Sequence, residues 1–367
     1  MRTSRTWNAA VVAVLTAGGL ALGAASPAAA APSGGREVRT AFAAPAGPAA
    51  GLPVPGSLDG VAARSPGSAW AVGQTSSDST ESDRPILAHW NGTGWRTVSS
   101  PALPARGGLN AVATFTGGGW AVGQAGVLVH GGDPRNLIVR LAGTTARRMP
   151  IRPADGELFG VAATSAANAW AVGGDDSPLI LHWNGTVWKR APLPSPVGLG
   201  VFTAVAATSR TNAWAVLNPA RQPGRARIVH WNGRRWGQVV SPAIGASYRL
   251  FGVAATSARN AWAVGFTGSG QTVILHWGGL RWKRVPSPDG FLLAVSASSA
   301  DNAWAVGVTA SGGLALHWNG RSWKQVMTPP SNFLAGVSFI PPSRHAWAVG
   351  GSGGATLILH WNGTAWR

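Results

Sequence analysis

The chain has 367 residues, of which 45% are hydrophobic and 11% are charged, and its formal net charge at pH 7 is +18. It holds no cysteine, which excludes a disulfide framework, a cysteine-ligated metal and a cysteine-linked lipid anchor. Nearly all of the excess charge is arginine, which favours affinity for anionic polymers at a cell surface; arginine-rich codon usage in a GC-rich genome is an alternative explanation of equal weight.

Residues 1–30 have the three parts of an export signal. Arg2 and Arg5 supply the positive end, and Ala9–Ala25 supplies the apolar run. Ala28–Ala30 then provides a cleavage site of small residues. The apolar run is short and rich in alanine and glycine, so a retained membrane anchor is the less favoured alternative. The sequence therefore predicts a secreted, extracellular protein whose mature chain has no membrane span and associates with the cell surface only through its positive charge.

After residues 31–35, expected to be a flexible segment, one phrase recurs along the chain. Leu158–Gly173 reads LFGVAATSAANAWAVG, and Leu250–Gly265 repeats it with a single exchange. The tryptophan of the recurring Trp-Ala-Val triplet stands in seven places: Trp70, Trp120, Trp170, Trp214, Trp262, Trp304 and Trp347. Seven units of 42 to 50 residues are typical of a β-propeller with four strands per blade. We predict an all-β fold in which residues 36–367 form a single seven-bladed β-propeller of four-stranded antiparallel blades.

The fifth unit shows where the four strands are expected. Phe251–Ser257 and Asn260–Phe266 are the first two, and Thr272–Trp277 and Trp282–Pro288 are the last two. Valine, isoleucine and tryptophan alternate with a period of two residues, which predicts strands. The first strand is built of small residues, which suits the innermost position where blades crowd toward the axis.

The sequence HWNG-x-x-W predicts how the third and fourth strands are joined. Asn-Gly is the strongest signal for a two-residue hairpin, because both central residues of a type I′ turn need positive φ. In the third unit, a two-residue turn at Asn184–Gly185 pairs Trp183 with Thr186. We therefore expect Trp183 and Trp188 to be diagonal neighbours on one face of the hairpin.

Residues that recur in almost every unit are expected to build the blades rather than bind a ligand. Six histidines precede a tryptophan of the third strand: His89, His182, His230, His276, His317 and His360. Third strands stand roughly 10 Å outside the inner strands, whereas zinc needs its ligand atoms about 2 Å away, so these histidines do not converge. We expect no metal and no cofactor, and we interpret the histidines as hydrogen-bonding groups between blades.

The seventh unit has only Trp366–Arg367 in place of a fourth strand. Arg36–Pro45, which precedes the first unit, is similar to the fourth-strand phrases WRTVSSP and WKRVPSP. We predict that this N-terminal segment is the outer strand of the last blade and closes the ring, because closure hides the open edge of a linear stack.

The phrase S-A-x-N-A-W-A-V-G followed by L-I-L-H-W-N-G-T-x-W resembles the tryptophan-rich propeller repeats of secreted proteins from high-GC Gram-positive bacteria, which are broadly similar to kelch and Asp-box propellers. The resemblance covers Leu58–Arg367. It implies the propeller architecture and no particular activity. In the second unit, Arg140–Pro150 lacks the histidine and the tryptophans of the phrase, so this unit is the degenerate copy.

Charged side chains gather in the loops whose length varies between units. These loops join the second strand to the third, and the fourth to the next unit, so they share one face of the propeller. Binding sites on repeat scaffolds lie on such variable loops. The candidate binding residues on this variable-loop face are Asp78, Glu81, Asp83, His130, Asp133, Arg135, Asp175, Asp176, Arg221, Arg225, Arg227, Tyr248 and Arg249.

Three functions fit these residues. The first is a non-catalytic module that binds a cell-surface or extracellular glycan or anionic polymer, with arginines holding phosphate or carboxylate groups. The second is a glycan-processing enzyme, which needs two carboxylates across the scissile bond. The third is a scaffold for protein–protein interaction. We adopt the first, with no catalytic residue assigned, and expect a monomer that does not bind nucleic acid, because every tryptophan has a structural place.

Overall fold

The computed structural model describes the greater part of the chain after its N-terminal region. The described residues are 52, 54–75, 83–126, 135–151, 156–175, 177–195, 197–221, 223–340 and 343–367. The chain divides into two compact units, Met1–Ala46 and Gly47–Arg367, and all described residues belong to the second. The predicted export signal, the flexible segment at residues 31–35 and the predicted closing strand Arg36–Pro45 lie outside the described residues.

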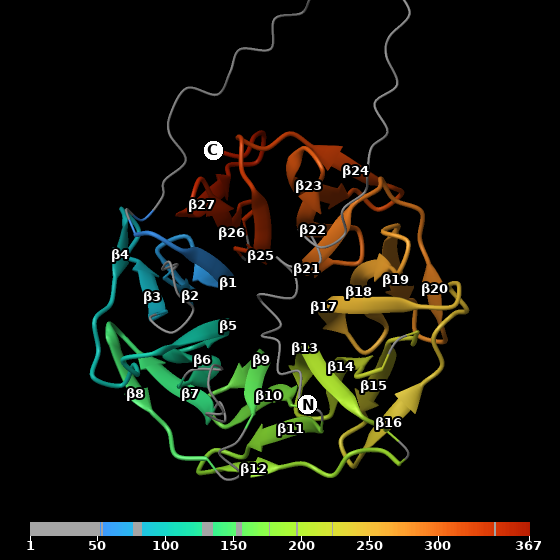
Figure 1. The fold of residues 1–367 in the computed structure, drawn as a ribbon, viewed down its shortest axis with the longest axis horizontal. Helices are drawn as coiled ribbons and strands as arrows, with labels where there is room; N and C mark the ends of the chain where they lie inside the picture. Colours follow the sequence, from blue (N-terminus) through green and yellow to red (C-terminus); the bar gives the residue numbers. More distant parts are fainter. Residues whose placement is uncertain are drawn as a thin grey trace, which may run out of the picture. The chain divides into compact units, whose positions relative to one another are not determined.

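Seven antiparallel sheets form the blades of a β-propeller, as predicted (Figure 1). The innermost strands are β1 (Ser57–Ser65), β5 (Gly107–Phe115), β9 (Glu157–Ser165), β13 (Gly200–Ser209), β17 (Tyr248–Ser257), β21 (Phe291–Ser299) and β25 (Phe333–Phe339). The second strands are β2 (Ser68–Gln74), β6 (Gly118–Ala125), β10 (Asn168–Gly174), β14 (Asn212–Pro219), β18 (Asn260–Thr267), β22 (Asn302–Thr309) and β26 (Ala346–Ser352). The third strands are β3 (Pro85–Trp90), β7 (Arg135–Ala142), β11 (Pro178–Trp183), β15 (Arg227–Trp231), β19 (Thr272–Trp277), β23 (Gly312–Trp318) and β27 (Ala355–Trp361). The outermost strands are β4 (Trp95–Thr97), β8 (Thr145–Arg148), β12 (Trp188–Arg190), β16 (Trp236–Val239), β20 (Trp282–Arg284) and β24 (Trp323–Val326).

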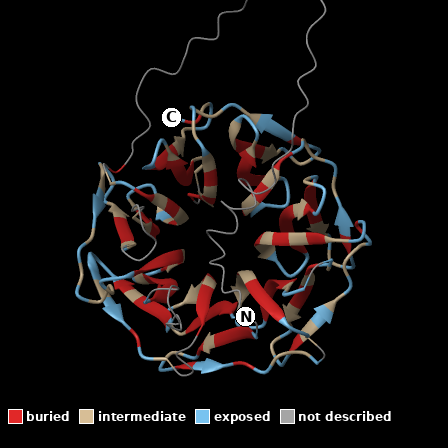
Figure 2. Cartoon of the chain, in the orientation of Figure 1, coloured by how far each residue is buried: buried red, intermediate tan, exposed pale blue. Residues whose placement is uncertain are grey.

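The core is divided into seven hydrophobic clusters, each of which joins one blade to the next. In blade three (β9–β12), Leu181 faces blade two (β5–β8), whereas Ile180 faces blade four (β13–β16). Consecutive strand residues point to opposite faces of a sheet, so each blade buries both of its faces. Figure 2 shows the result, with buried inner strands and exposed outermost strands.

Small residues on the inner strands allow the blades to approach closely near the axis. Gly160 lies on β9, and a Cβ atom there would stand 3.0 Å from the Cα atom of Ala204 in blade four. Gly252 on β17 has the same relation to Ala294 in blade six (β21–β24), also at 3.0 Å. The small residues predicted for the innermost strand therefore have a direct steric cause.

Each inner strand carries a β-bulge at one position of the repeat. At this position the register with the second strand skips one residue of the inner strand, and the skipped residues are Asp59, Asn110, Phe159, Thr203, Phe251, Leu293 and Ala335. A bulge increases the local twist and redirects a side chain. The alternation of residues along the sequence did not reveal these bulges.

The hairpin between the third and fourth strands is longer than the two-residue turn that we predicted. Trp183 pairs directly with Trp188, so four residues form the loop. The side-chain Oδ1 of Asn184 accepts hydrogen bonds from the backbone N–H groups of Thr186 and Val187, both at 3.0 Å. In this loop the asparagine supplies a side-chain acceptor and the glycine adopts positive φ, and the two do not form the centre of a type I′ turn.

The recurrent histidines hydrogen-bond within their own blade, which corrects the expected bonds between blades. His182 Nε2 lies 2.9 Å from Asn168 Oδ1, and both residues belong to blade three. The imidazole of His182 also stacks on Trp170, with ring centroids 4.1 Å apart. The same two contacts occur at His230 with Asn212 and Trp214. The histidine therefore packs the second strand against the third.

Two separate segments lie on the outer edge of blade seven (β25–β27). Trp366–Arg367 continues the chain after β27, and the backbone N and O of Arg367 bond to those of His360 at 3.0 and 2.7 Å. Val54–Gly56 runs antiparallel to the beginning of β27. There, Val54 O accepts from Thr356 N at 3.2 Å, and Gly56 N donates to Gly354 O at 2.9 Å. Residues from before the first unit thus complete the edge of the last one.

Candidate functional site

Five of the thirteen candidate loop residues lie outside the described residues: Asp78, Glu81, His130, Asp133 and Asp176. Among the others, Arg135, Asp175, Arg221 and Arg225 are exposed. Asp83 is half-buried, and its backbone oxygen accepts a hydrogen bond from Gly107 N at 3.0 Å.

Tyr248 does not lie on an exposed loop, contrary to what its position in the sequence indicated. Its side chain is 1% exposed and belongs to the hydrophobic cluster between blades four and five (β17–β20). Arg225, which lies just before β15, forms a parallel bridge with Tyr248, and Ala226 N donates to Tyr248 O at 3.0 Å. Burial raises the pKa of the Tyr248 hydroxyl above its usual value. Tyr248 therefore packs two blades together.

Arg227 and Arg249 are both half-buried. The Arg227 guanidinium donates a hydrogen bond to the backbone oxygen of Val197 in the segment that joins blades three and four. Burial lowers the pKa of Arg249 from its usual value. These two arginines take part in the packing of the propeller, so the exposed arginines among the candidate residues are Arg135, Arg221 and Arg225.

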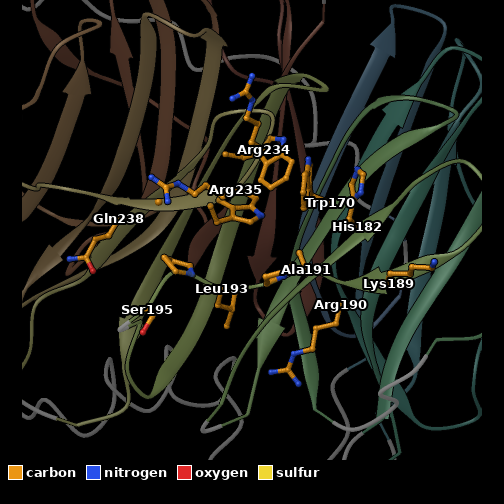
Figure 3. Close-up of a pocket in the computed structure, with 15 residues that line it drawn as sticks. Trp170, His182, Lys189, Arg190, Ala191, Leu193, Ser195, Arg234, Arg235 and Gln238 are labelled. Atoms are coloured by element: carbon orange, nitrogen blue, oxygen red, sulfur yellow. The ribbon is translucent and has the colours of Figure 1, made fainter.

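A groove of about 690 Å³ lies between the outer parts of blades three and four (Figure 3). Lys189 and Arg190 on β12 contribute to one side, and Arg234 and Arg235 in the hairpin before β16 contribute to the other. The segment from Ala191 to Ser195 adds two prolines to the lining. We call this site the basic groove.

The aromatic lining of the basic groove comes from the recurrent packing between blades. Trp170 of blade three contacts Trp231 and Trp236 of blade four, with ring centroids 5.0 Å apart in both pairs. The contact with Trp236 is edge-on, at 83°. Such edge-to-face pairs are favourable because the positive edge of one ring meets the negative face of the other. Trp170 and Trp236 are almost fully buried, whereas Trp231 is half-buried.

The charge in the basic groove is positive and has no acidic counterpart among the lining residues. Lys189, Arg190, Arg234 and Arg235 are all exposed. The Arg190 guanidinium donates to the backbone oxygen of Pro178 at 3.4 Å, which leaves most of its donors directed elsewhere.

His182, which also lines the groove, adds no charge at neutral pH. Burial lowers the pKa of its imidazole below the usual value, and the positive charge of Arg210 lowers it further. Arg210 is exposed and lies in the turn between β13 and β14. The groove is therefore suited to hold anionic groups against an aromatic surface.

We did not predict this site from the sequence, because we expected binding residues only on the variable loops. A signal was nevertheless present, because Asn232–Arg235 is the only one of the seven loops between the third and fourth strands with two adjacent arginines. The WKR of β12 directly precedes it in the ring. What the sequence could not show is that an outer strand and the hairpin of the next blade meet in one groove.

A second polar cluster lies among the inner strands of blades two and three. Asn110 Nδ2 donates to Glu157 Oε1 at 2.9 Å and to Leu158 O at 2.8 Å. Burial raises the pKa of Glu157 to about 7, although the hydrogen bond from Asn110 opposes the shift and the charges of Asp59 and Asp175 add to it. Burial also raises the pKa of Asp59 to about 7.

Within the described ranges, no three histidine or acidic side chains are placed to hold a metal ion.

Comparison with known proteins shows the fold and no family. No family model matches the chain, and no curated protein matches it. Among solved structures, YCF48 bound to D1 peptide is similar, with 16% identity and a TM-score of 0.60 over 86% of this chain and 96% of that one. The BP39L lectin from Burkholderia pseudomallei has 14% identity and a TM-score of 0.58, over 86% of this chain and 98% of that one. The RRP9 WD40 repeats have 11% identity and a TM-score of 0.58, over 85% and 95% of the two chains.

These likenesses agree with the seven-bladed propeller of four-stranded antiparallel blades. The part of the chain that the structure describes contains no helix long and apolar enough to cross a membrane.

Proposed function

We propose that this protein is a secreted, non-catalytic binding module that holds an anionic ligand in the basic groove between blades three and four. The observation that carries the proposal is the meeting of four exposed cationic side chains, with no acidic residue, in one groove lined by tryptophan. A single exposed ion pair contributes only about 0–1 kcal/mol, so it is the convergence of four cations that makes the groove distinctive.

Similar solved structures support a binding role. One is described as bound to a peptide and another as a lectin, so both present a ligand-binding surface on a propeller. Fold alone does not decide function, and the proposal therefore depends on the groove. The export signal predicted for residues 1–30 and the resemblance to secreted propeller repeats support the part of this proposal that puts the protein outside the cell.

The buried carboxyl groups fit the alternative of a glycan-processing enzyme less well. A glycosidase pairs a protonated acid with an ionised carboxylate. Burial disfavours the ionised form of both Asp59 and Glu157 and raises their pKa values to about 7, so neither is held as an ionised carboxylate by its surroundings. Glu157 is only 6% exposed and accepts a hydrogen bond from Asn110. These contacts support a structural role for Glu157.

The test is binding of a short anionic probe, tetragalacturonate, to the purified chain over a range of salt concentrations. A variant with Lys189, Arg190, Arg234 and Arg235 changed to alanine should bind about tenfold more weakly, which corresponds to ~1.4 kcal/mol. Binding of the unmodified chain should weaken as salt is added, because exposed charges are screened.

The matched control removes four exposed cations away from the basic groove: Arg84, Arg106, Arg321 and Arg344. It should bind the probe as the unmodified chain does. Equal losses in both variants would show that only net charge matters and would contradict the proposal. A loss on changing Arg221 and Arg225 alone would instead place the site on the variable-loop face.

A further inference from the structure

The basic groove is part of a longer run of cations along the outside of the propeller. The outermost strands and the hairpins before them carry two or three exposed lysines or arginines in each of blades two to six, and Arg96 in blade one. We call the part of this surface in blades two to five the basic rim, and it consists of Arg147, Arg148, Lys189, Arg190, Arg234, Arg235, Arg281, Lys283 and Arg284. In Figure 2 the outermost strands form the exposed perimeter of the ring. The basic groove lies at the middle of this run.

The basic rim has no acidic residue of its own. The third strands, the outermost strands and the hairpins between them contain neither aspartate nor glutamate in any of the seven blades. In blade six, Asp301 lies against the hairpin, since a Cβ atom on Gly320 would stand 3.3 Å from Asp301 Oδ1. In blades four and five, the corresponding turns present Thr211 and Arg259 to the hairpin instead. The positive surface is therefore uncompensated from blade two to blade five and weakens at blade six.

The shape of this surface selects the kind of polyanion. The basic rim follows the convex perimeter of the ring, as Figure 1 shows for β8, β12, β16 and β20. A flexible chain can follow a convex surface, whereas duplex DNA, with a persistence length of about 150 base pairs, stays nearly straight over such a distance. A rigid duplex would reach the cations of only one or two blades.

The chemistry of the groove favours a sugar over a nucleobase. Single-stranded nucleic acids bind through aromatic faces on which bases stack. Over the described ranges, the exposed large hydrophobic side chains include no aromatic residue. The groove instead offers the half-buried Trp231 together with the exposed polar side chains of Ser195 and Gln238, which can bond to hydroxyl groups. Its cations can bind carboxylates at the same time.

We infer that the ligand is an acidic polysaccharide that lies along the basic rim from blade two to blade five, with the basic groove as its central subsite. This inference rests on the proposed function, because it requires that the groove bind anionic groups. It adds that cations on the neighbouring blades also contact a ligand long enough to reach them. Affinity then grows with ligand length through multivalent contact.

The experiment compares tetragalacturonate with long polygalacturonate. The long polymer should bind about tenfold or more tightly than the tetramer at equal concentration of sugar units, and with a steeper dependence on salt. A flank variant with Arg147, Arg148, Arg281 and Lys283 changed to alanine should lose this advantage and yet bind the tetramer normally. The control variant that lacks Arg84, Arg106, Arg321 and Arg344 should keep the advantage.

The remaining outcomes distinguish failure of the extended site from failure of the proposed function. Equal affinity and equal salt dependence for the tetramer and the polymer would overturn the extended site, while loss of tetramer binding in the groove variant would still support the proposed function. Equally tight binding of duplex DNA or long-chain polyphosphate would overturn the polysaccharide assignment. If the groove variant binds the tetramer normally, it is the proposed function that fails.

Discussion

At the scale of single residues, Glu157 is a buried carboxyl group whose pKa is strongly raised. It begins β9, is 6% exposed, and accepts a hydrogen bond from Asn110 in the neighbouring blade. Burial disfavours the charged carboxylate and raises its pKa to about 7. Between pH 4.5 and about 7, Glu157 therefore keeps a proton in the folded protein that it releases in the unfolded chain.

We predict that the free energy of unfolding falls as the pH rises from about 4.5 to about 7. A group whose folded pKa is raised stabilises the fold below its unfolded pKa, and this contribution is lost as the pH passes the folded pKa. The full effect for Glu157 is up to about 3 kcal/mol. Thermal melts at pH 5 and pH 8 measure it, and the melting temperature should be lower at pH 8.

Glu157→Gln keeps an oxygen to accept the bond from Asn110 and cannot ionise, so it should remove the part of the pH dependence that comes from Glu157, while the part from Asp59 remains. Its melting temperature at pH 8 should exceed that of the unmodified chain. Asp289→Asn, at an exposed position, is the control and should change little. A Glu157→Gln variant with the same pH dependence as the unmodified chain would show that Glu157 ionises without penalty.

At the scale of elements, the loop between the third and fourth strands depends on the side chain of one asparagine. In five blades the Oδ1 atom of this asparagine accepts hydrogen bonds from two backbone N–H groups of the loop, at 2.9 to 3.1 Å. The five asparagines are Asn91, Asn184, Asn232, Asn319 and Asn362. Blade five has glycine at the same place, Gly278, and so has no side-chain acceptor there. A Cβ atom on Gly278 would meet nothing within 4 Å.

We predict that Gly278→Asn stabilises the protein by about 1 kcal/mol, because it adds the missing acceptor and reduces the freedom of the unfolded chain. Asn184→Ala should destabilise the protein by a similar amount, because two loop N–H groups lose their partner. Denaturation by urea measures both changes. Opposite signs for the two variants are required, and a destabilising Gly278→Asn would contradict this account of the loop.

At the scale of the whole molecule, stability depends on the contact between the two ends of the ring. Leu52 is 4% exposed and packs in the cluster that joins blade seven to blade one (β1–β4). Its backbone oxygen accepts a hydrogen bond from Thr356 Oγ1 at 2.7 Å. Val54–Gly56 adds backbone bonds to the edge of β27. A segment of a few residues thus connects the first blade to the last.

We predict that a chain beginning at residue 57 is less stable than one beginning at residue 47 by about 3 kcal/mol, since it lacks one buried leucine and the adjoining hydrogen bonds. Calorimetry measures the difference, and hydrogen exchange should localise it to β27. Equal stability would show that the segment contributes nothing. A chain beginning at residue 47 that is itself much less stable than the full chain would support a role for Arg36–Ala44 in closure.

Much of the fold was predictable because its signals are local and occur seven times. The Trp-Ala-Val spacing indicated the number of blades, and Phe251–Ser257 and Thr272–Trp277 lie within strands that the structure contains. The hairpin register was mispredicted because Asn-Gly has two uses, and only the loop geometry distinguishes a type I′ turn from a side-chain acceptor. The partner of His182 was also mispredicted, since it depends on which second-strand side chain reaches the imidazole.

The sequence by itself determined the class of the fold, the number of blades and the order of their strands, because strand period and turn chemistry act over a few residues. Tertiary structure alone decided that Tyr248 is buried, that Glu157 meets Asn110, and that the cations of two blades meet in one groove. Each of these depends on how one blade packs against the next. Residues such as Lys189 and Arg235, which come from different units of the repeat, meet only when the ring has formed.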